Sequence, residues 1–105
     1  MMAYCLSKAA VAQLTRCAAL ELASKGIRVN AVCPGVTEST NIFVNAGLPT
    51  IVHDKTMERV KNVYPLGRPG TPEEVAKSIV FLASEESASY MTGVTLSIDG
   101  GRVVS

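Results

Sequence analysis

The stretch IRVNAVCPG, residues 27–35, decides the fold. Residues 27–33 form a short, nearly continuous apolar run rich in β-branched side chains. Such a run is typical of a strand that is covered on both faces of a parallel sheet. Pro34 and Gly35 then end the strand. Because ligands of open α/β sheets bind just past the carboxyl ends of the strands, this turn is a candidate binding position.

Helices are predicted on both sides of this strand. Residues 4–25 contain no proline or glycine, and Gly26 follows where a helix would stop. Their apolar side chains fall on two neighbouring stripes, so we expect this helix to be buried on more than one side. The stretch TPEEVAKSIVFLAS, residues 71–84, opens with a capping box, in which Thr71 is the N-cap and Glu74 follows three residues later.

The remaining segments complete an α/β order of elements. Residues 36–64 show no sustained period and are interpreted as a long mobile loop, with one or two helical turns within residues 53–63. Residues 94–98, VTLSI, predict a second strand, and residues 99–101 predict a tight turn. Two strands and two main helices do not complete a doubly wound parallel sheet. The sequence therefore predicts part of one, its C-terminal half.

Composition narrows the classes of partner. The 105 residues are 48% hydrophobic and only 18% charged, so we expect some apolar surface to face another chain or a part of the protein outside this sequence. A net charge of +1 without any run of Lys or Arg argues against nucleic acid. No apolar run is long enough to cross a membrane, and no leader of the secretory type is present. The expected setting is the cytoplasm.

The three cysteines and the single histidine do not suggest a metal site. Cys5, Cys17 and Cys33 lack the spacing of metal ligands or of a redox pair, and His53 has no second imidazole. We expect the cysteines to be reduced thiols that act as small core residues.

The stretch YCLSK, residues 4–8, carries the first candidate chemistry. On a helix, Tyr4 and Lys8 lie side by side and could act on a common ligand. A free tyrosine titrates near pH 10, and a neighbouring ammonium group favours the phenolate, which suits a phenol to proton exchange at neutral pH. The pair is either catalytic or a chance spacing on a helix face.

Four segments, in order, resemble the C-terminal half of the classical short-chain dehydrogenases/reductases. The segments are YCLSK, IRVNAVCPG, GRPGTPEEVAKSIVFLAS and SASYMTGVTLSIDGG. The resemblance implies that residues 1–105 are the C-terminal part of a single Rossmann-like domain that binds NAD or NADP. It also implies that the protein interconverts a ketone and a secondary alcohol. Within the family, the general resemblance is to 3-oxoacyl-acyl-carrier-protein reductases.

The same resemblance implies roles for the Tyr-Lys pair. Tyr4 would exchange a proton with the oxygen of the substrate carbonyl or alcohol, and Lys8 would also bind the nicotinamide ribose hydroxyls. Asn30, in contrast, is interpreted as a strand residue whose amide bonds its own surroundings, because buried amides need partners.

The turn after the strand would hold the nicotinamide. In the family, main-chain groups just after Pro34 and Gly35 bind the carboxamide, which assigns this role to Val36 and Thr37. The family usually has a threonine five places after the proline, where this chain has Ser39. Either Ser39 substitutes for it or Thr40 does.

The family's Gly-rich phosphate turn, catalytic asparagine and catalytic serine would all precede Tyr4. None of the eight glycines forms such a turn between a strand and a helix. We therefore expect little activity from these residues alone. The alternative is a non-enzymatic α/β fragment that associates with a full-length relative, and in either case we expect association with a second chain, as a homo-oligomer or with that relative.

Overall fold

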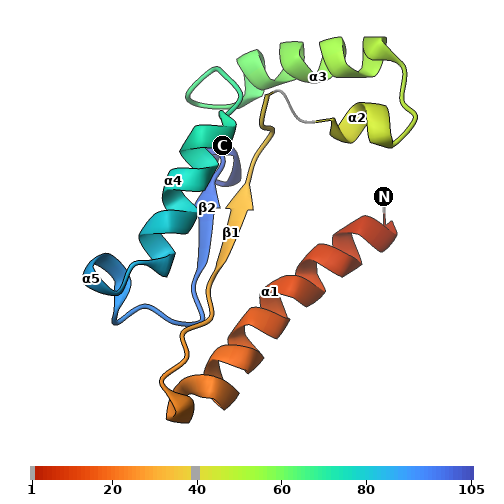
Figure 1. Cartoon of the computed structure of the whole chain (residues 1–105). Coiled ribbons are helices and arrows are strands. Elements are labelled where there is room, and N and C mark those ends of the chain that lie inside the picture. The colour runs from red at the N-terminus through yellow and green to blue at the C-terminus, as the bar shows by residue number, and fades with distance from the viewer. Residues whose placement is uncertain (1, 39–40) are drawn as a thin grey trace. The chain divides into compact units, whose positions relative to one another are not determined.

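The computed structural model describes residues 2–38 and 41–105, which divide into two compact units. The first unit comprises Met1–Cys33 and Ser78–Leu96, and the second comprises Pro34–Lys77 and Ser97–Ser105. Strands β1 (Ala31–Pro34) and β2 (Thr95–Ile98) pair in parallel (Figure 1). With the helices described below, this pairing confirms the predicted α/β class.

The first unit begins with helix α1 (Met2–Leu22). A short 3₁₀ helix, η1 (Ala23–Lys25), tightens its last turn. Gly26 then adopts a left-handed conformation, with φ of 69°, and its N–H donates to the carbonyl of Ala23 at 3.0 Å. Since this conformation costs glycine nothing, the predicted helix end at Gly26 is confirmed.

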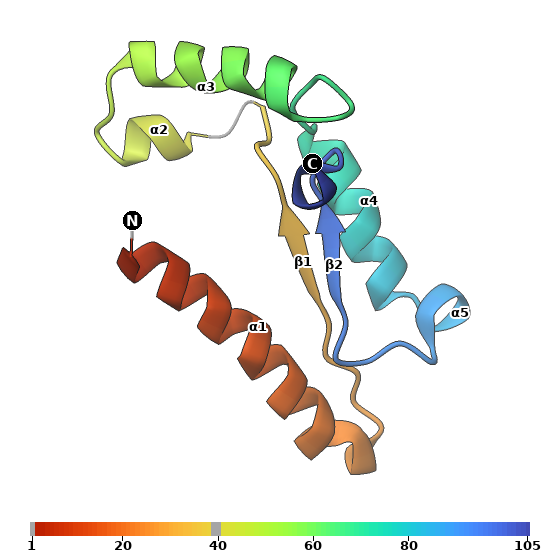
Figure 2. The same cartoon turned by 180° about the vertical axis from the view of Figure 1, so that it is seen from behind.

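Helix α1 packs through one narrow face. Thr15 and Ala19 are buried, and the methyl group of Ala19 lies 3.5 Å from where a side chain on Gly93 would begin. Elsewhere on the helix, Leu14 and Leu20 are 66% and 81% exposed. The expected burial on more than one side is therefore wrong for this chain. Within the first unit, α1 lies on the side of β1 and the end of α4 on the side of β2 (Figure 2).

Strand β1 begins at Ala31, four residues later than predicted. Before it, side-chain hydrogen bonds supplement the backbone bond from the N–H of Gly93 to the Val29 carbonyl at 2.7 Å. The N–H of Val29 donates to the Thr92 hydroxyl at 3.1 Å, and the Asn30 amide donates to the Met91 carbonyl at 2.9 Å. The N–H of Val94 donates to the Asn30 side-chain oxygen at 3.0 Å. The prediction that Asn30 bonds its own surroundings is confirmed.

The expected coverage of the strand and the cysteines is also wrong. The side chains of Cys33 and Pro34 are exposed, so β1 is not covered on both faces. All three cysteines are unpaired and exposed instead of acting as core residues. The reason is that few elements cover these surfaces, since the buried apolar side chains in the described part of the chain are Ala19, Val60, Leu82 and Ala88.

The second unit contains helices where a loop was predicted. Helix α2 (Ile42–Asn45) and helix α3 (Thr50–Val63) occupy most of residues 41–64. The 14-residue α3 is much longer than the one or two turns expected. Val60 is the buried residue of α3 and is only 1% exposed. Burial thus supports a helix that the sequence pattern did not reveal.

Helix α4 (Pro72–Ala83) begins as predicted. The N–H of Glu74 donates to the Thr71 hydroxyl at 3.2 Å, and the N–H of Thr71 donates to the Glu74 carboxylate at 2.9 Å. This reciprocal pair is a capping box. A short helix, α5 (Glu85–Ala88), follows, with Ser84 as its N-cap.

A tight turn follows β2, as predicted. Gly100 and Gly101 both have positive φ, and the Asp99 carboxylate accepts bonds from the N–H groups of Gly101 and Val103. The chain ends in a 3₁₀ helix, η2 (Arg102–Val104). Within residues 2–38 and 41–105, no helix has the length and apolar character that a bilayer span requires.

Candidate functional site

Tyr4 and Lys8 lie side by side on α1. The Lys8 Nζ is positioned over the Tyr4 ring, 5.5 Å from its centroid. Tyr4 is 58% exposed, so a ligand could reach it without any rearrangement of the helix. The i, i+4 spacing thus gives the predicted juxtaposition, in which an ammonium contacts the face of a phenol.

The Pro-Gly turn leaves the carboxyl end of β1. The N–H of Gly35 continues the strand pairing by donating to the Ile98 carbonyl at 2.9 Å. A side chain at position 35 would begin 3.0 Å from Cα of Asp99 and 3.1 Å from the ring of Tyr64. Glycine suits this position because a Cβ would be crowded by both neighbours and could be accommodated only if they shifted by a few tenths of an ångström.

Val36 is held through both of its main-chain groups. Its N–H donates to the Tyr64 hydroxyl at 3.2 Å, and its carbonyl accepts from the N–H of Gly70 at 2.9 Å. Thr37 forms a parallel bridge with Gly70, and the N–H of Glu38 donates to the Gly70 carbonyl at 2.9 Å. The turn is therefore held by Tyr64 and by Gly70, both distant in sequence.

The structure assembles the predicted site residues into two groups. Tyr4 and Lys8 belong to the first unit, whereas Pro34, Gly35, Val36 and Thr37 belong to the second. Each group is formed within its own unit. Ser39 and Thr40, the two candidates for the family's threonine, lie outside the described residues.

A network around Arg68 holds the start of α4. The Arg68 guanidinium donates to both oxygens of the Glu74 carboxylate, at 2.6 and 3.0 Å. These bonds and the bond from the Thr71 N–H lower the pKa of Glu74 from 4.5 to about 2. Since Thr71 follows Gly70, the same network adjoins the residue that pairs with the Pro-Gly turn.

The capping box should weaken only in strong acid. A lowered pKa in the folded state means that the contribution of Glu74 to stability is complete above about pH 4.5 and is lost as the pH falls through about 2. The amide proton shift of Thr71, followed by NMR, should report that midpoint. In Arg68→Gln, the midpoint should rise towards 4.5, because the largest cause of the shift is removed. A midpoint near 4.5 in the unaltered protein would contradict this assignment.

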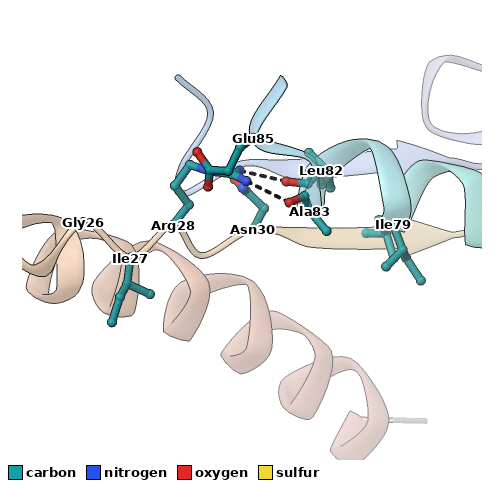
Figure 3. A pocket seen from close by; sticks show the side chains of 9 residues that line it. Gly26, Ile27, Arg28, Asn30, Ile79, Leu82, Ala83 and Glu85 are labelled. Carbon is teal, nitrogen blue, oxygen red and sulfur yellow. Dashed lines mark hydrogen bonds and ion pairs between the residues drawn. The ribbon is translucent and has the colours of Figure 1, made fainter. Parts of the chain in front are cut away.

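A depression of about 500 Å³ lies in the first unit (Figure 3). Its lining includes Arg28, Asn30, Val32, Ile79 and Glu85. None of the residues predicted to bind substrate or cofactor lines it. We therefore do not place the candidate site in this depression.

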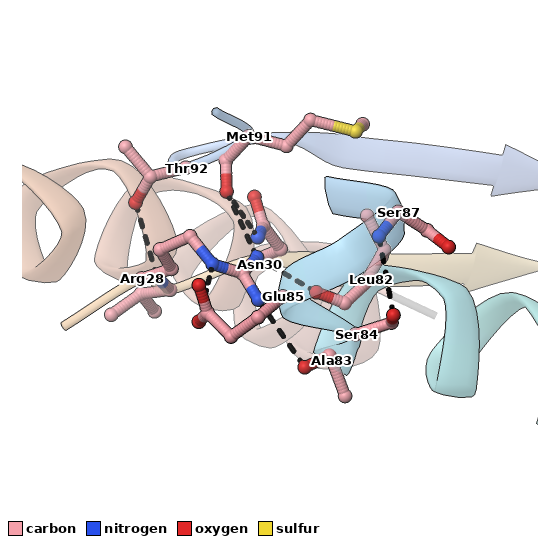
Figure 4. Close-up of polar contacts among 10 residues, drawn as sticks. Arg28, Asn30, Leu82, Ala83, Ser84, Glu85, Ser87, Met91 and Thr92 are labelled. Carbon is pink, nitrogen blue, oxygen red and sulfur yellow. Dashed lines mark hydrogen bonds and ion pairs between the residues drawn. The ribbon is translucent and has the colours of Figure 1, made fainter. Parts of the chain in front are cut away.

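Arg28 was not singled out from the sequence, yet it organises this region (Figure 4). Its side chain is 14% exposed, and Nε lies 3.3 Å from the Glu85 carboxylate. The guanidinium also donates to the carbonyls of Leu82, Ala83 and Met91. A cation that bonds the last carbonyls of a helix stabilises its end. In the sequence, the signal that could have pointed to Arg28 is its charge within an otherwise apolar, strand-like run.

Among the described residues, no group of three or more His, Cys, Asp and Glu side chains could hold a metal ion. The predicted site residues offer a phenol, an ammonium group and the main-chain groups of the turn.

Comparisons with known proteins identify the family. Residues 1–102 match the family model described as enoyl-(acyl carrier protein) reductase. The chain is 48% identical over 101 residues to the 3-oxoacyl-[acyl-carrier-protein] reductase FabG of Thermotoga maritima, covering 96% of this chain and 38% of that protein. It is 43% identical over 104 residues to the inactive 2-(S)-hydroxypropyl-CoM dehydrogenase 2 of Xanthobacter autotrophicus, covering 96% of this chain and 43% of that one.

A comparison with solved structures indicates the same family. A short-chain dehydrogenase/reductase of unknown function from Caenorhabditis elegans, crystallised with cofactor, matches with a TM-score of 0.86 and 39% identity. The match covers 96% of this chain and 38% of that one. The chain belongs to the short-chain dehydrogenase/reductase family, an oxidoreductase family, and its fold is part of a Rossmann-like parallel sheet. It spans about two fifths of the length of these relatives.

Proposed function

We propose that residues 1–105 are the C-terminal part of one Rossmann-like domain, in an NAD- or NADP-dependent oxidoreductase that interconverts a ketone and a secondary alcohol. The observation that carries the proposal is the placement of Lys8 over Tyr4 on α1. Family membership supports it. We use "full-length protein" for residues 1–105 together with the upstream segment that we propose precedes them. A transcript with no coding sequence upstream would contradict this domain assignment.

Tyr4 is the proposed acid and base. Its hydroxyl donates a proton to the carbonyl oxygen during reduction and takes one from the alcohol during oxidation. Lys8, whose Nζ lies over the Tyr4 ring, binds the ribose hydroxyls of the cofactor. The nicotinamide, when bound, supplies the hydride.

The turn at the end of β1 is the proposed contact with the nicotinamide carboxamide. Its main-chain groups lie at the carboxyl end of a parallel strand, which suits the nicotinamide end of the cofactor. We assign this contact to Val36 and Thr37 and the cofactor-binding turn that presents them to Pro34 and Gly35, and the role of Ser39 stays a prediction. The Tyr64 hydroxyl already accepts the N–H of Val36, so the proposed contact runs through the other main-chain groups of these residues. The residues present do not fit the pyrophosphate, because this chain has no Gly-rich turn between a strand and a helix.

The 105-residue chain alone should not bind NADH or NADPH appreciably, whereas the full-length protein should. The reason is that a Gly-rich turn and a helix N-terminus normally hold the pyrophosphate. Titration followed by nicotinamide fluorescence measures both. Tight, saturable binding to the 105-residue chain would show that the site is complete without an upstream half.

The proposed substrate is a small, uncharged carbonyl compound or alcohol. Helices α2 and α3 and their connection follow the Pro-Gly turn and expose apolar side chains, namely those of Ile42, Val44, Leu48 and Ile51. We propose no nucleic-acid partner and no membrane partner. The unpaired cysteines support a reducing, cytoplasmic setting.

The second candidate function is a non-enzymatic α/β fragment that associates with a full-length relative. The exposed leucines of α1 favour this candidate, since they offer apolar surface to a second chain. The inactive relative from Xanthobacter autotrophicus supports it as well. The two candidates differ in whether substitution of Tyr4 changes any rate.

A further inference from the structure

We infer that Tyr64 is a positioning residue for the Pro-Gly turn, and that it sets the affinity for the nicotinamide cofactor without taking part in proton or hydride transfer. The inference rests on the proposed function, because it concerns the same turn.

The position of Tyr64 is fixed by its own backbone. It is the C-cap residue of α3, and its N–H donates to the carbonyl of Val60 at 3.0 Å. Its carbonyl accepts from the N–H of Gly67 at 2.8 Å. Val60 is only 1% exposed. The side chain of Tyr64 is therefore presented from a helix end that is bonded on both sides and anchored by a buried residue one turn earlier.

The ring of Tyr64 fills the space left by two glycines. One edge lies 3.1 Å from where a side chain on Gly35 would begin, and another ring atom lies 3.5 Å from the same point on Gly100. The same edge of the ring thus packs against both the Pro-Gly turn after β1 and the glycine turn after β2. Any Cβ at position 35 would meet it, so the ring and the glycine fit as a matched pair.

The hydroxyl of Tyr64 then fixes the direction of one peptide group. It accepts the N–H of Val36 at 3.2 Å, while the N–H of Gly70 bonds the carbonyl of the same residue at 2.9 Å. The bond from the Val36 N–H restricts the Gly35–Val36 peptide, and the bond to the Val36 carbonyl restricts the Val36–Thr37 peptide, so the path of the turn into Thr37 is held at both peptides. A turn that is held in this way before the cofactor arrives loses less conformational freedom on binding.

The test separates the hydroxyl from the ring. Tyr64→Phe in the full-length protein retains the ring between the glycines and removes only the bond to Val36. Tyr90→Phe is the matched control, because it makes the same substitution at a fully exposed position. We expect the KM for the cofactor to rise about three- to tenfold in Tyr64→Phe, as befits one lost hydrogen bond, with kcat within about twofold of the parent. Tyr90→Phe should change neither parameter.

A second readout does not depend on activity. Amide hydrogen exchange at Val36 should be about tenfold faster in Tyr64→Phe, with exchange at Val60 unchanged. If exchange at Val36 does not change, the anchoring is overturned. If exchange rises but the KM is unchanged or falls, the turn is anchored without positioning the cofactor, and the inference is overturned.

Failure of the proposed function gives a different pattern. A parent protein without any nicotinamide-dependent rate would overturn the proposed function and the cofactor part of this inference, while exchange at Val36 would still decide the anchoring. If no upstream segment exists, the domain assignment and the proposed function fail together, while exchange at Val36 in the 105-residue chain still decides the anchoring.

Discussion

Replacing Tyr4 with phenylalanine should lower the rate of carbonyl reduction by the full-length protein about a hundredfold to ten-thousandfold. The substitution removes a single oxygen atom and retains the ring that Lys8 contacts at 5.5 Å. The loss should therefore appear in the chemical step, since a proton must reach the carbonyl oxygen as the hydride arrives.

Steady-state rates at saturating cofactor provide the measurement. Tyr90→Phe serves as the control, since it makes the same change at a fully exposed position. If Tyr4→Phe retains a rate within about threefold of the parent, Tyr4 is not the acid. A parent protein without any activity would instead support the non-enzymatic candidate.

The isolated 105-residue chain should not persist as a stable monomer. On α1, Leu6, Leu14 and Leu20 are 65%, 66% and 81% exposed. Each Å² of apolar surface left in water forfeits about 25 cal/mol, so a few hundred Å² amounts to several kcal/mol. That is comparable with the whole stability of a small domain. We expect self-association, docking on a partner or partial unfolding.

Light scattering combined with urea denaturation tests this expectation. Leu20→Glu should reduce self-association, because it places a charge on the exposed apolar surface of α1. Ser24→Glu is the matched control, since it adds the same charge at an exposed polar position of η1. A monodisperse monomer at micromolar concentration with one cooperative urea transition would contradict the expectation.

The features that the sequence predicted correctly depend on local chemistry. Gly26 ends a helix because it alone adopts the left-handed conformation freely, and Thr71 and Glu74 form a capping box through groups three residues apart. The Tyr4 and Lys8 pair follows from helical spacing. In each case, the partners lie within four residues of each other, so sequence spacing alone defines the contact.

The features that were missed depend on contacts between distant residues. Helix α3 is rich in β-branched residues and has no side-chain cap at Pro49, so its local signals are weak and the burial of Val60 was needed to reveal it. The late start of β1 reflects bonds from Asn30 to residues near position 92. Tyr64 and Val36 are 28 residues apart. No spacing rule in the sequence predicts such pairs.

The first unit is built from two segments that are far apart in the sequence, and this has a consequence for its synthesis on the ribosome. Arg28 bonds the carbonyl of Met91, 63 residues further along the chain. At about 5–20 residues per second, translation of the intervening segment takes about 3–13 s. During that interval, α1 and the residues that become β1 are synthesised without the partners that bury Ala19 and bond Asn30. A chaperone that binds apolar helices would therefore have its best opportunity before residue 96 emerges.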